Sequence, residues 1–274
     1  MPLSALFLAL AAAALHALWN LLIARARDPE AATAVALIAA AIAFAPVGVV
    51  TWDVDADAWP YIVASATLEL AYFALLAAAY RRSELGLVYP LARGLAPVFV
   101  LVAAAVVLGT DPSFGEVVGV AAITIGVFLV RGIGRSADRR GTLFAVVIAG
   151  CISAYTLVDK EGMQHAAPLP YLELVLAGPA LVYAAGLASA RGRPAVRAEI
   201  GIPAIAAGLA MFGAYAFVLA ALDRAAAAPV AAVRETSVVL ATVLAARVLH
   251  ERVTPARLAG AVVVAGGVAV LALT

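Results

Sequence analysis

Ten apolar runs of about 20 residues follow one another along the chain, and short segments between them hold most of the charges. A helix of about 20 apolar residues crosses the roughly 30 Å hydrocarbon core of a bilayer, because each residue adds 1.5 Å. The connecting segments leave no room for a soluble domain. We therefore predict an all-α integral membrane protein with ten transmembrane helices. The predicted spans are 3–24, 32–51, 60–80, 85–108, 114–131, 141–159, 169–188, 201–222, 226–247 and 255–273.

The composition excludes several other classes of protein. Of the 274 residues 66% are hydrophobic and 13% are charged, whereas about 25% are charged in a soluble domain. One soluble core cannot hide so many apolar residues, so we expect lipid to surround much of the protein surface. A net charge of +1, with no basic patch outside the loops, indicates no nucleic-acid partner. The single cysteine, Cys151, excludes a disulfide framework and a paired-cysteine metal site. Without a P-loop, HExxH or GxSxG motif, we expect no enzyme, no metal and no cofactor.

The basic residues predict the orientation in the membrane. The odd-numbered loops hold 14 of the 18 basic residues, whereas the even-numbered loops hold only Lys160 and Arg224, and the even-numbered loop 52–59 is acidic. Cytoplasmic loops carry an excess of Lys and Arg. We therefore expect a multi-pass protein of the cytoplasmic (inner) cell membrane, with the odd-numbered loops in the cytoplasm and both termini outside.

The two halves of the chain repeat the same pattern. Arg93 and Arg234 are 141 positions apart, and further matches are Gly119 with Gly260, Gly126 with Gly267, and Ser113 with Thr254 at the same offset, and the segment 16–21 with 152–157 at an offset of 136. This predicts two five-helix repeats, 1–132 and 141–274. Because each holds an odd number of spans, the second is inserted upside down. Such an inverted 5+5 repeat is common in secondary transporters, with the substrate near the midplane between the repeats.

Several motifs of this chain resemble the EamA-type family of the drug/metabolite transporter (DMT) superfamily. They are Leu87-Val-Tyr-Pro-Leu-Ala-Arg-Gly-Leu-Ala-Pro97, Val233-Arg-Glu-Thr-Ser237, Leu249-His-Glu-Arg-Val253 with Gly260 and Gly267, and His16-Ala-Leu-Trp-Asn20. The similarity covers nearly the whole chain, in two copies. It implies a carrier linked to protons or monovalent cations, often an exporter, or an exchanger. Members of the family are often described with both termini in the cytoplasm, whereas the arginines of this chain favour the reverse.

Two arginines inside predicted spans are the leading candidates for substrate binding. An ionisable side chain near mid-span costs at least about 2.5–3.5 kcal/mol and is rare unless it faces a cavity or a partner. Arg93 and Arg234 are each the ninth residue of their span, so both are expected near the midplane. They could hold an anionic group such as an amino-acid carboxylate through bidentate hydrogen bonds. The alternative is a structural role, with Arg93 paired to Glu69 and Arg234 to a carboxylate such as Glu235.

Three helix-breaking residues surround Arg93. Pro97 lacks the N–H group that would bond to the Arg93 carbonyl, and Pro90 and Gly94 loosen the same turn. We therefore predict a break in the helix at Pro90, Gly94 and Pro97, with a simple kink as the alternative.

Three residues are candidates for proton coupling, and six more for the substrate site. Glu69 is the leading proton carrier, because a low-dielectric environment favours the neutral carboxyl; Glu235 and His16 are further candidates. Aromatic and amide side chains could line the same cavity or simply pack the helices. These additional candidates for substrate binding are Trp19, Asn20, Tyr72, Tyr89, Tyr155 and Tyr215.

The repeated glycines predict close helix packing. Gly119 and Gly126 are seven residues apart, as are Gly260 and Gly267, so each pair lies on one helix face. Small residues on one face let membrane helices approach closely. The spans 114–131 and 255–273 could therefore pack on each other, or form the contact of a homodimer.

The leading hypothesis is a secondary transporter, proton-coupled and exporting, that moves a small polar or anionic metabolite such as an amino acid by alternating access. A lipid-carrier flippase is one alternative, and it would require a lateral opening and a basic headgroup pocket. A membrane scaffold or sensor is another, and it would require fully paired buried charges and no wet cavity.

Overall fold

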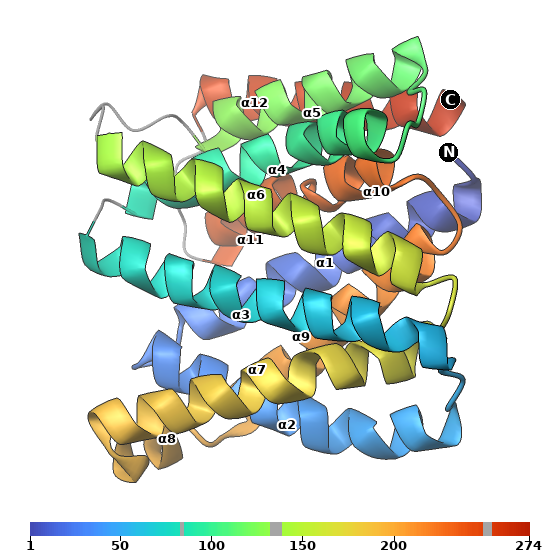
Figure 1. The fold of residues 1–274 in the computed structure, drawn as a ribbon. Coiled ribbons are helices and arrows are strands. Elements are labelled where there is room, and N and C mark those ends of the chain that lie inside the picture. The colour runs from blue at the N-terminus through green and yellow to red at the C-terminus, as the bar shows by residue number, and fades with distance from the viewer. Residues whose placement is uncertain (83–84, 132–138, 249–253) are drawn as a thin grey trace.

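The computed structural model describes residues 1–82, 85–131, 139–248 and 254–274, and this part of the chain is helical, without a named strand (Figure 1). The predicted all-α fold with ten spans in two repeats is confirmed. The helices are α1 (Leu3–Ala24), α2 (Pro29–Val50), η1 (Ala56–Ala58), α3 (Trp59–Arg82), α4 (Leu85–Val107), α5 (Phe114–Arg131), α6 (Arg139–Gly162), α7 (Pro168–Arg191), α8 (Arg193–Ala198), α9 (Ile202–Leu222), α10 (Ala227–Arg234), α11 (Ser237–Val248) and α12 (Pro255–Leu273).

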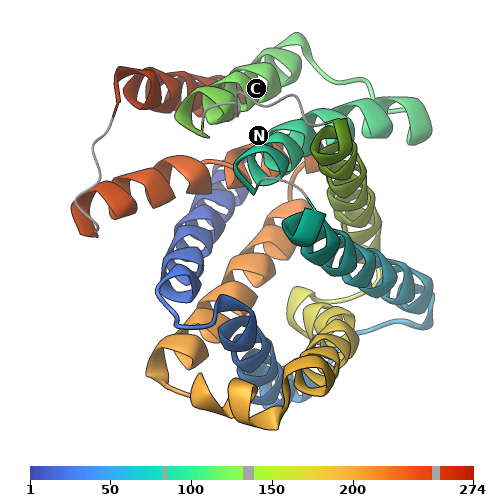
Figure 2. The same cartoon turned by 90° about the vertical axis from the view of Figure 1, so that its left-hand side faces the viewer.

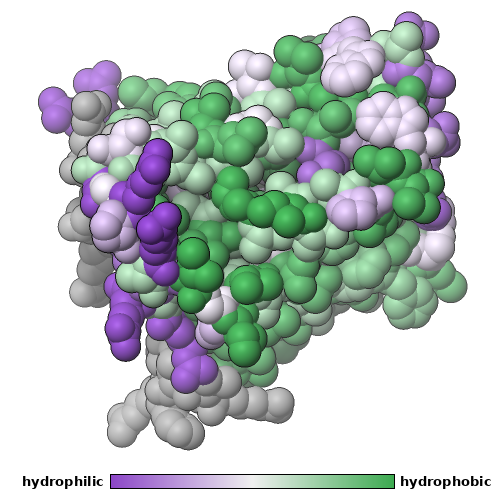
Figure 3. All heavy atoms as spheres, turned by 90° about the horizontal axis from the view of Figure 1, so that it is seen from below, coloured by the Kyte–Doolittle hydropathy of each residue, from purple (hydrophilic) through white to green (hydrophobic). Residues whose placement is uncertain are grey.

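The long helices have the length and composition of membrane spans. Eight segments of the described chain are long and apolar enough to cross a bilayer, one of them running from α10 into α11, and α4 and α5 contain the shorter apolar stretches Leu91–Val107 and Phe114–Val130. Apolar side chains cover the middle of the surface, and polar ones gather toward its two ends (Figure 3). This is the distribution that a bilayer around the middle of the helices requires.

The two ends of the bundle differ in charge. The basic face is the end where α1 ends and α2 begins, with Arg25 and Arg27. The opposite face holds the segments 51–58 and 163–167 and both termini (Figure 1). Viewed from the basic face, α5 and α12 form one edge of the bundle and α2 and α7 the other (Figure 2).

The packing of α5 against α12 follows a two-fold symmetry. A Cβ atom added to Gly126 would lie 2.8 Å from the carbonyl oxygen of Gly260, and one added to Gly267 would lie 2.9 Å from that of Gly119. Exchanging each glycine for the one 141 positions away turns one contact into the other. The glycines therefore pack on each other within one chain, and this is the alternative that the structure selects over a homodimer contact.

The other contacts between the halves obey the same exchange. Swapping each helix for its equivalent turns the contact α1–α9 into α6–α3, α4–α6 into α10–α1, and α2–α9 into α7–α3. The pairs α2–α7, α4–α10 and α5–α12 map onto themselves. Such reciprocal contacts are what a two-fold axis between two similar units produces.

The interruption of a helix occurs in the second half rather than the first. In place of the predicted break at Pro90, Gly94 and Pro97, α4 is one continuous helix through all three residues. Neighbouring helices make proline tolerable within a membrane helix, and a ring of Phe128 fills the space beside Gly94.

The predicted span 226–247 is instead divided into α10 and α11 at Glu235 and Thr236. The hydroxyl of Thr236 donates to the carbonyl oxygen of Val233 at 2.7 Å, and a threonine side chain that binds the local backbone competes with the helix. The backbone N–H groups of Glu235 and Thr236 bond three residues back, to Ala232 and Val233 at 3.0 Å each. The turn satisfies its own carbonyl groups, so it can lie inside a membrane protein.

Asp28 caps the start of α2 on the basic face. Its Oδ1 atom accepts hydrogen bonds from the backbone N–H groups of Glu30 (3.1 Å) and Ala31 (3.2 Å), and its Oδ2 atom pairs with Arg191 at 3.0 Å. The N–H of Ala31 holds the pKa of Asp28 below its usual 3.8, with help from Arg191 and against the effect of burial. The stabilisation is therefore complete at neutral pH and is lost as the pH falls through the lowered pKa.

Replacing this cap is expected to have a modest and pH-dependent effect. Asp28→Ala should lower the free energy of unfolding by about 1 kcal/mol at pH 7, as for other helix caps. The matched control is Asp55→Ala, because Asp55 precedes η1 without a side-chain cap. Thermal unfolding of the purified protein measures both. A difference between Asp28→Ala and the unmodified protein that persisted unchanged at pH 3 would contradict this account.

Candidate functional site

A cavity of about 120 Å³ lies between the two halves, with room for several water molecules. Its walls come from α1, α2, α3 and α4 of the first half and from α6, α7, α9 and α10 of the second. Eight of the residues singled out in the sequence meet there. They are His16, Trp19, Glu69, Tyr72, Arg93, Tyr155, Tyr215 and Arg234.

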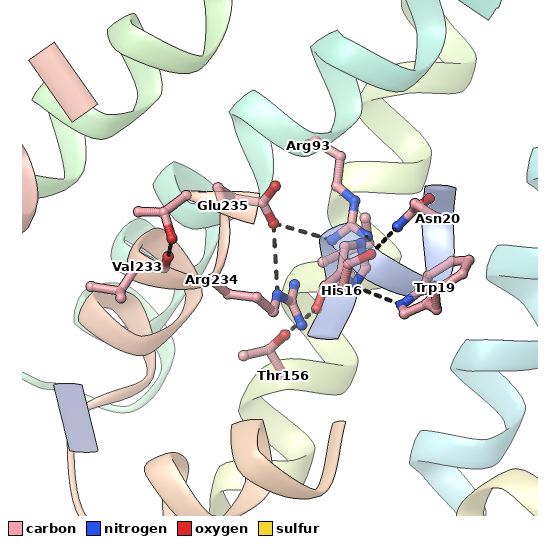
Figure 4. Close-up of polar contacts among 10 residues, drawn as sticks. His16, Trp19, Asn20, Arg93, Thr156, Val233, Arg234 and Glu235 are labelled. Atoms are coloured by element: carbon pink, nitrogen blue, oxygen red, sulfur yellow. Dashed lines mark hydrogen bonds and ion pairs between the residues drawn. The ribbon is translucent and has the colours of Figure 1, made fainter. Parts of the chain in front are cut away.

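The two arginines converge on one carboxylate. The Nη1 atom of Arg93 lies 3.1 Å from Oε1 of Glu235, and the Nε atom of Arg234 lies 3.6 Å from the same oxygen (Figure 4). The three side chains are almost completely buried, with exposed fractions of 7%, 4% and 1% in the order Arg93, Arg234 and Glu235. Neither guanidinium points to lipid, because both line the cavity.

The repeat explains why two guanidinium groups share a single acid here. The offset of 141 that relates Arg93 to Arg234 places Gly94 opposite Glu235, so the first half has no carboxylate at the position equivalent to Glu235. Among the described residues, the Nε and Nη2 atoms of Arg234 and the Oε2 atom of Glu235 are buried without a hydrogen-bond partner. A buried donor of this kind costs about 1–3 kcal/mol unless water or a ligand meets it.

In the structure, Arg93 pairs with a different acid from the one considered in the sequence analysis. Arg93 pairs with Glu235 and not with Glu69, so the structural alternative holds in part but with a different acid. Glu69, on α3, is 7% exposed and lines the cavity. In the described part of the chain, it has neither a hydrogen bond nor an ion pair. Glu69 is therefore a carboxyl group available to a ligand or a proton.

His16 positions Arg93 from the side of α1. Its Nε2 atom lies 2.7 Å from Nη2 of Arg93, and because a guanidinium only donates, Nε2 must accept. The indole N–H of Trp19 lies 3.3 Å from Nδ1 of the same ring, so His16 contacts both Arg93 and Trp19.

Four of the remaining candidates lie fully within the described part of the chain, and none of these four lines the cavity. Asn20 donates from Nδ2 to the backbone carbonyl of His16 at 2.7 Å, so it binds its own helix. Glu235 contacts both arginines but does not itself line the cavity. Gly94 and Pro97 are buried in α4. Tyr89 and Pro90 belong to the α4 backbone, but their side chains are outside the described part, as is the motif 249–253.

The sequence analysis missed one acidic residue, Asp159. It is fully buried, and its carboxylate accepts hydrogen bonds from Tyr171 (2.9 Å) and Tyr215. Asp159 is the last residue of the predicted span 141–159, and the prediction places Lys160 in the loop that follows. In the structure α6 continues to Gly162, which carries Asp159 inward. The signal in the sequence was the pair of tyrosines, Tyr171 in the predicted span 169–188 and Tyr215 in the predicted span 201–222.

Comparisons with known proteins agree with this architecture. One solved crystal structure matches at a TM-score of 0.78 and 18% sequence identity, over 98% of each chain; at this identity the likeness concerns the fold alone. No curated protein matches the sequence. The model of the EamA-like transporter family matches residues 3–132 and again residues 139–273. Two matches that together span nearly the entire chain establish that it belongs to the EamA-like transporter family, within the DMT superfamily of membrane transporters.

Proposed function

We propose that this protein is a proton-coupled secondary transporter that exports a small anionic or zwitterionic metabolite, with amino acids as the first class to test. The proposal rests on one observation: Arg93 and Arg234 share a single acid at a cavity between the repeats, so Arg234 retains an unused buried donor. A substrate carboxylate bound to Arg234 would supply the missing acceptor and balance the second positive charge.

Glu69 supplies a role for the proton. It lines the cavity that Arg234 also lines, so a zwitterion can place its carboxylate on the arginine and its ammonium group on Glu69. A proton and the ammonium group then compete for one carboxylate. Proton and substrate are therefore exchanged across the membrane. On one side a proton binds to Glu69 and the substrate is released, and on the other side the proton leaves and a new substrate binds.

In the proposed setting, the protein lies in the cytoplasmic membrane, and the charges favour an orientation in which the basic face is on the cytoplasmic side. The cavity wall is partly exposed at Trp19 and Thr33, toward the basic face, and buried at Ala12 and Val218, toward the opposite face. A cavity accessible from the cytoplasm suits the uptake of substrate for export. A fluorescent reporter fused to Thr274 should then lie outside the cell, and a cytoplasmic reporter would contradict the orientation.

The role of Glu69 predicts a selective loss of coupling. In proteoliposomes screened with amino acids, organic acids and phosphonates, an inward proton gradient should accelerate efflux of the true substrate. Glu69→Gln should abolish this acceleration, because glutamine cannot exchange a proton. A carboxylate substrate should still bind, since Arg234 is intact, and its binding is measured by thermal shift.

The matched control is Glu161→Gln, the same change in a carboxylate outside the cavity, whose partner is Gln164. It should leave the response to the gradient unchanged. Transport by Glu69→Gln that still follows the proton gradient would exclude Glu69 as the coupling group, whereas the absence of any transported substrate in the screen would argue against the substrate class.

The two alternatives have weaker support. A flippase would need a basic headgroup pocket, and a pocket of about 410 Å³ with Arg25 and Arg27 does lie at the basic face. However, it shares no lining residue with the central cavity. A scaffold would have fully paired buried charges, whereas Arg234 and Glu235 keep buried atoms without partners in the described chain.

A further inference from the structure

Asp159 joins three helices at the opposite-face end of the cavity. Its Oδ1 atom accepts from the hydroxyl of Tyr171 on α7, and its Oδ2 atom accepts from that of Tyr215 on α9. Hydrogen bonds to an ionised acceptor are roughly twice as strong as neutral ones. The ring of Tyr171 also packs directly on α6, because a Cβ atom added to Gly162 would lie 2.6 Å from it.

The next residue makes a second connection between the same helices. The Nζ atom of Lys160 donates to the carbonyl oxygen of Leu222 at 2.6 Å, at the last residue of α9. A positive charge is favourable at a helix C-terminus, where carbonyl groups lack partners. Two consecutive side chains of α6 therefore hold the end of α9.

These polar contacts connect two helices of the cavity wall that have few other contacts with each other. Helix α6 packs mainly on α3 and α4, whereas α9 packs mainly on α1 and α2, and the two helices touch each other little. Both line the cavity, α6 through Tyr155 and α9 through Ala214 and Val218. The polar contacts of Asp159 and Lys160 therefore tie walls that otherwise share little packing.

The backbone closes the same end. The N–H of Asp55 donates to the carbonyl of His165 at 2.9 Å, and that of Ala167 donates to Asp53 at 2.8 Å. At the basic face the repeat has no equivalent acid, since the offset of 136 places Ile23 where the second half has Asp159. Among the described residues, the polar side-chain contacts between α6 and α9 therefore lie toward the opposite face, whereas at the basic face Asp28 and Arg191 connect α2 with α7.

We propose that Asp159, with Tyr171 and Tyr215, forms the gate that closes the cavity toward the opposite face. This rests on the proposed alternating access. Tyr215 links the gate to the substrate site, because it lines the cavity and also binds Asp159. A substrate that takes the Tyr215 hydroxyl removes one of the two donors from Asp159, which weakens the closed state and opens the path to the opposite face.

The test measures access to the cavity without any substrate. A single cysteine is introduced as Ala214→Cys, in a Cys151→Ser background, and a membrane-impermeant maleimide is applied to either side of reconstituted protein. Asp159→Asn should increase the labelling rate from the opposite face by about 10-fold or more, as expected from weakening hydrogen bonds to a charged group. The matched control, Asp223→Asn, changes an exposed acid beside the end of α9 and should have no effect.

Tyr171→Phe provides a second variant, because it removes one donor and leaves Asp159 and the cavity wall in place. It should give a smaller increase from the same face. Unchanged labelling in the two variants, or an increase from the basic face only, would overturn the gate. Because the assay needs no substrate, this result is separate from the proposed function: a gate that responds while no substrate is transported contradicts only the substrate class.

Discussion

Arg234→Ala is expected to weaken substrate binding by about 100-fold while leaving the unliganded protein folded and as stable as before. Truncating one partner of a buried charged contact costs about 2–5 kcal/mol of binding energy, which corresponds to a loss of about 30-fold to 4,000-fold and includes the expected factor. Stability should be spared because Glu235 keeps its 3.1 Å contact with Arg93, and the repulsion between the two guanidinium groups is removed. Binding is measured by thermal shift or calorimetry, and efflux in proteoliposomes.

The contrast with Arg93 makes this prediction specific. Arg93→Ala should destabilise the protein itself by about 3–5 kcal/mol, because it deprives the buried Glu235 of its closest positive charge. Arg234→Lys keeps the charge but not the planar donor pair, so it should recover only part of the affinity. If Arg234→Ala bound and transported substrate normally, the role of the arginines would be structural, and the proposed substrate site would be wrong.

Gly267→Ala should clearly lower the stability of the protein, because it adds a methyl group where α5 and α12 are in close contact. The new Cβ atom would lie 2.7 Å from Cγ1 of Ile123 and 2.9 Å from the carbonyl oxygen of Gly119. Backbone atoms cannot turn aside as a side chain can, so α5 and α12 must separate. Overpacking of this kind costs about 1–3 kcal/mol, and the melting temperature in detergent measures it.

The neighbouring residue is an unusually close control. Gly266 is on the same helix and exposed, and nothing lies within 4 Å of a Cβ atom added to it. Gly266→Ala should therefore leave stability unchanged or raise it by about 0.5–1 kcal/mol, since alanine favours a helix. Equal melting temperatures for the two variants would contradict the close packing of α5 and α12 within the chain.

Much of the fold was predictable because lipid imposes a simple rule on the sequence. A segment of about 20 apolar residues has few alternatives to a helix in a bilayer, so the predicted ends of α1, α5 and α12 agree with the structure. The division of α10 from α11 was not predictable in this way. It depends on Thr236 binding the Val233 carbonyl and on Glu235 reaching Arg93, and the second of these is a contact with a distant helix.

The sequence predicted those residues of the site whose burial in a membrane span costs the most free energy. Arg93 and Arg234 attract attention because a charge inside a span needs a reason, and the repeat indicates that they meet. The spacing of residues in the sequence does not tell which acid the two arginines share. Glu69, Glu235 and Asp159 are all possible partners, and only the three-dimensional arrangement of the helices decides which carboxylate faces the arginines. Asp159 was missed because one extra helical turn, rather than composition, places it inside the protein.

The differences between the repeats also have a thermodynamic consequence. With two identical inverted halves, a two-fold rotation in the membrane plane would convert the inward-open form into the outward-open form, so the two would have equal free energies and equal populations at rest. Here Glu235 stands opposite Gly94, Asp159 stands opposite Ile23, and only one of the two arginine helices is divided. Each difference removes part of that equality, so the two forms of the empty protein differ in free energy; in the proposed mechanism, the binding of substrate and proton must supply the energy that populates the less stable form.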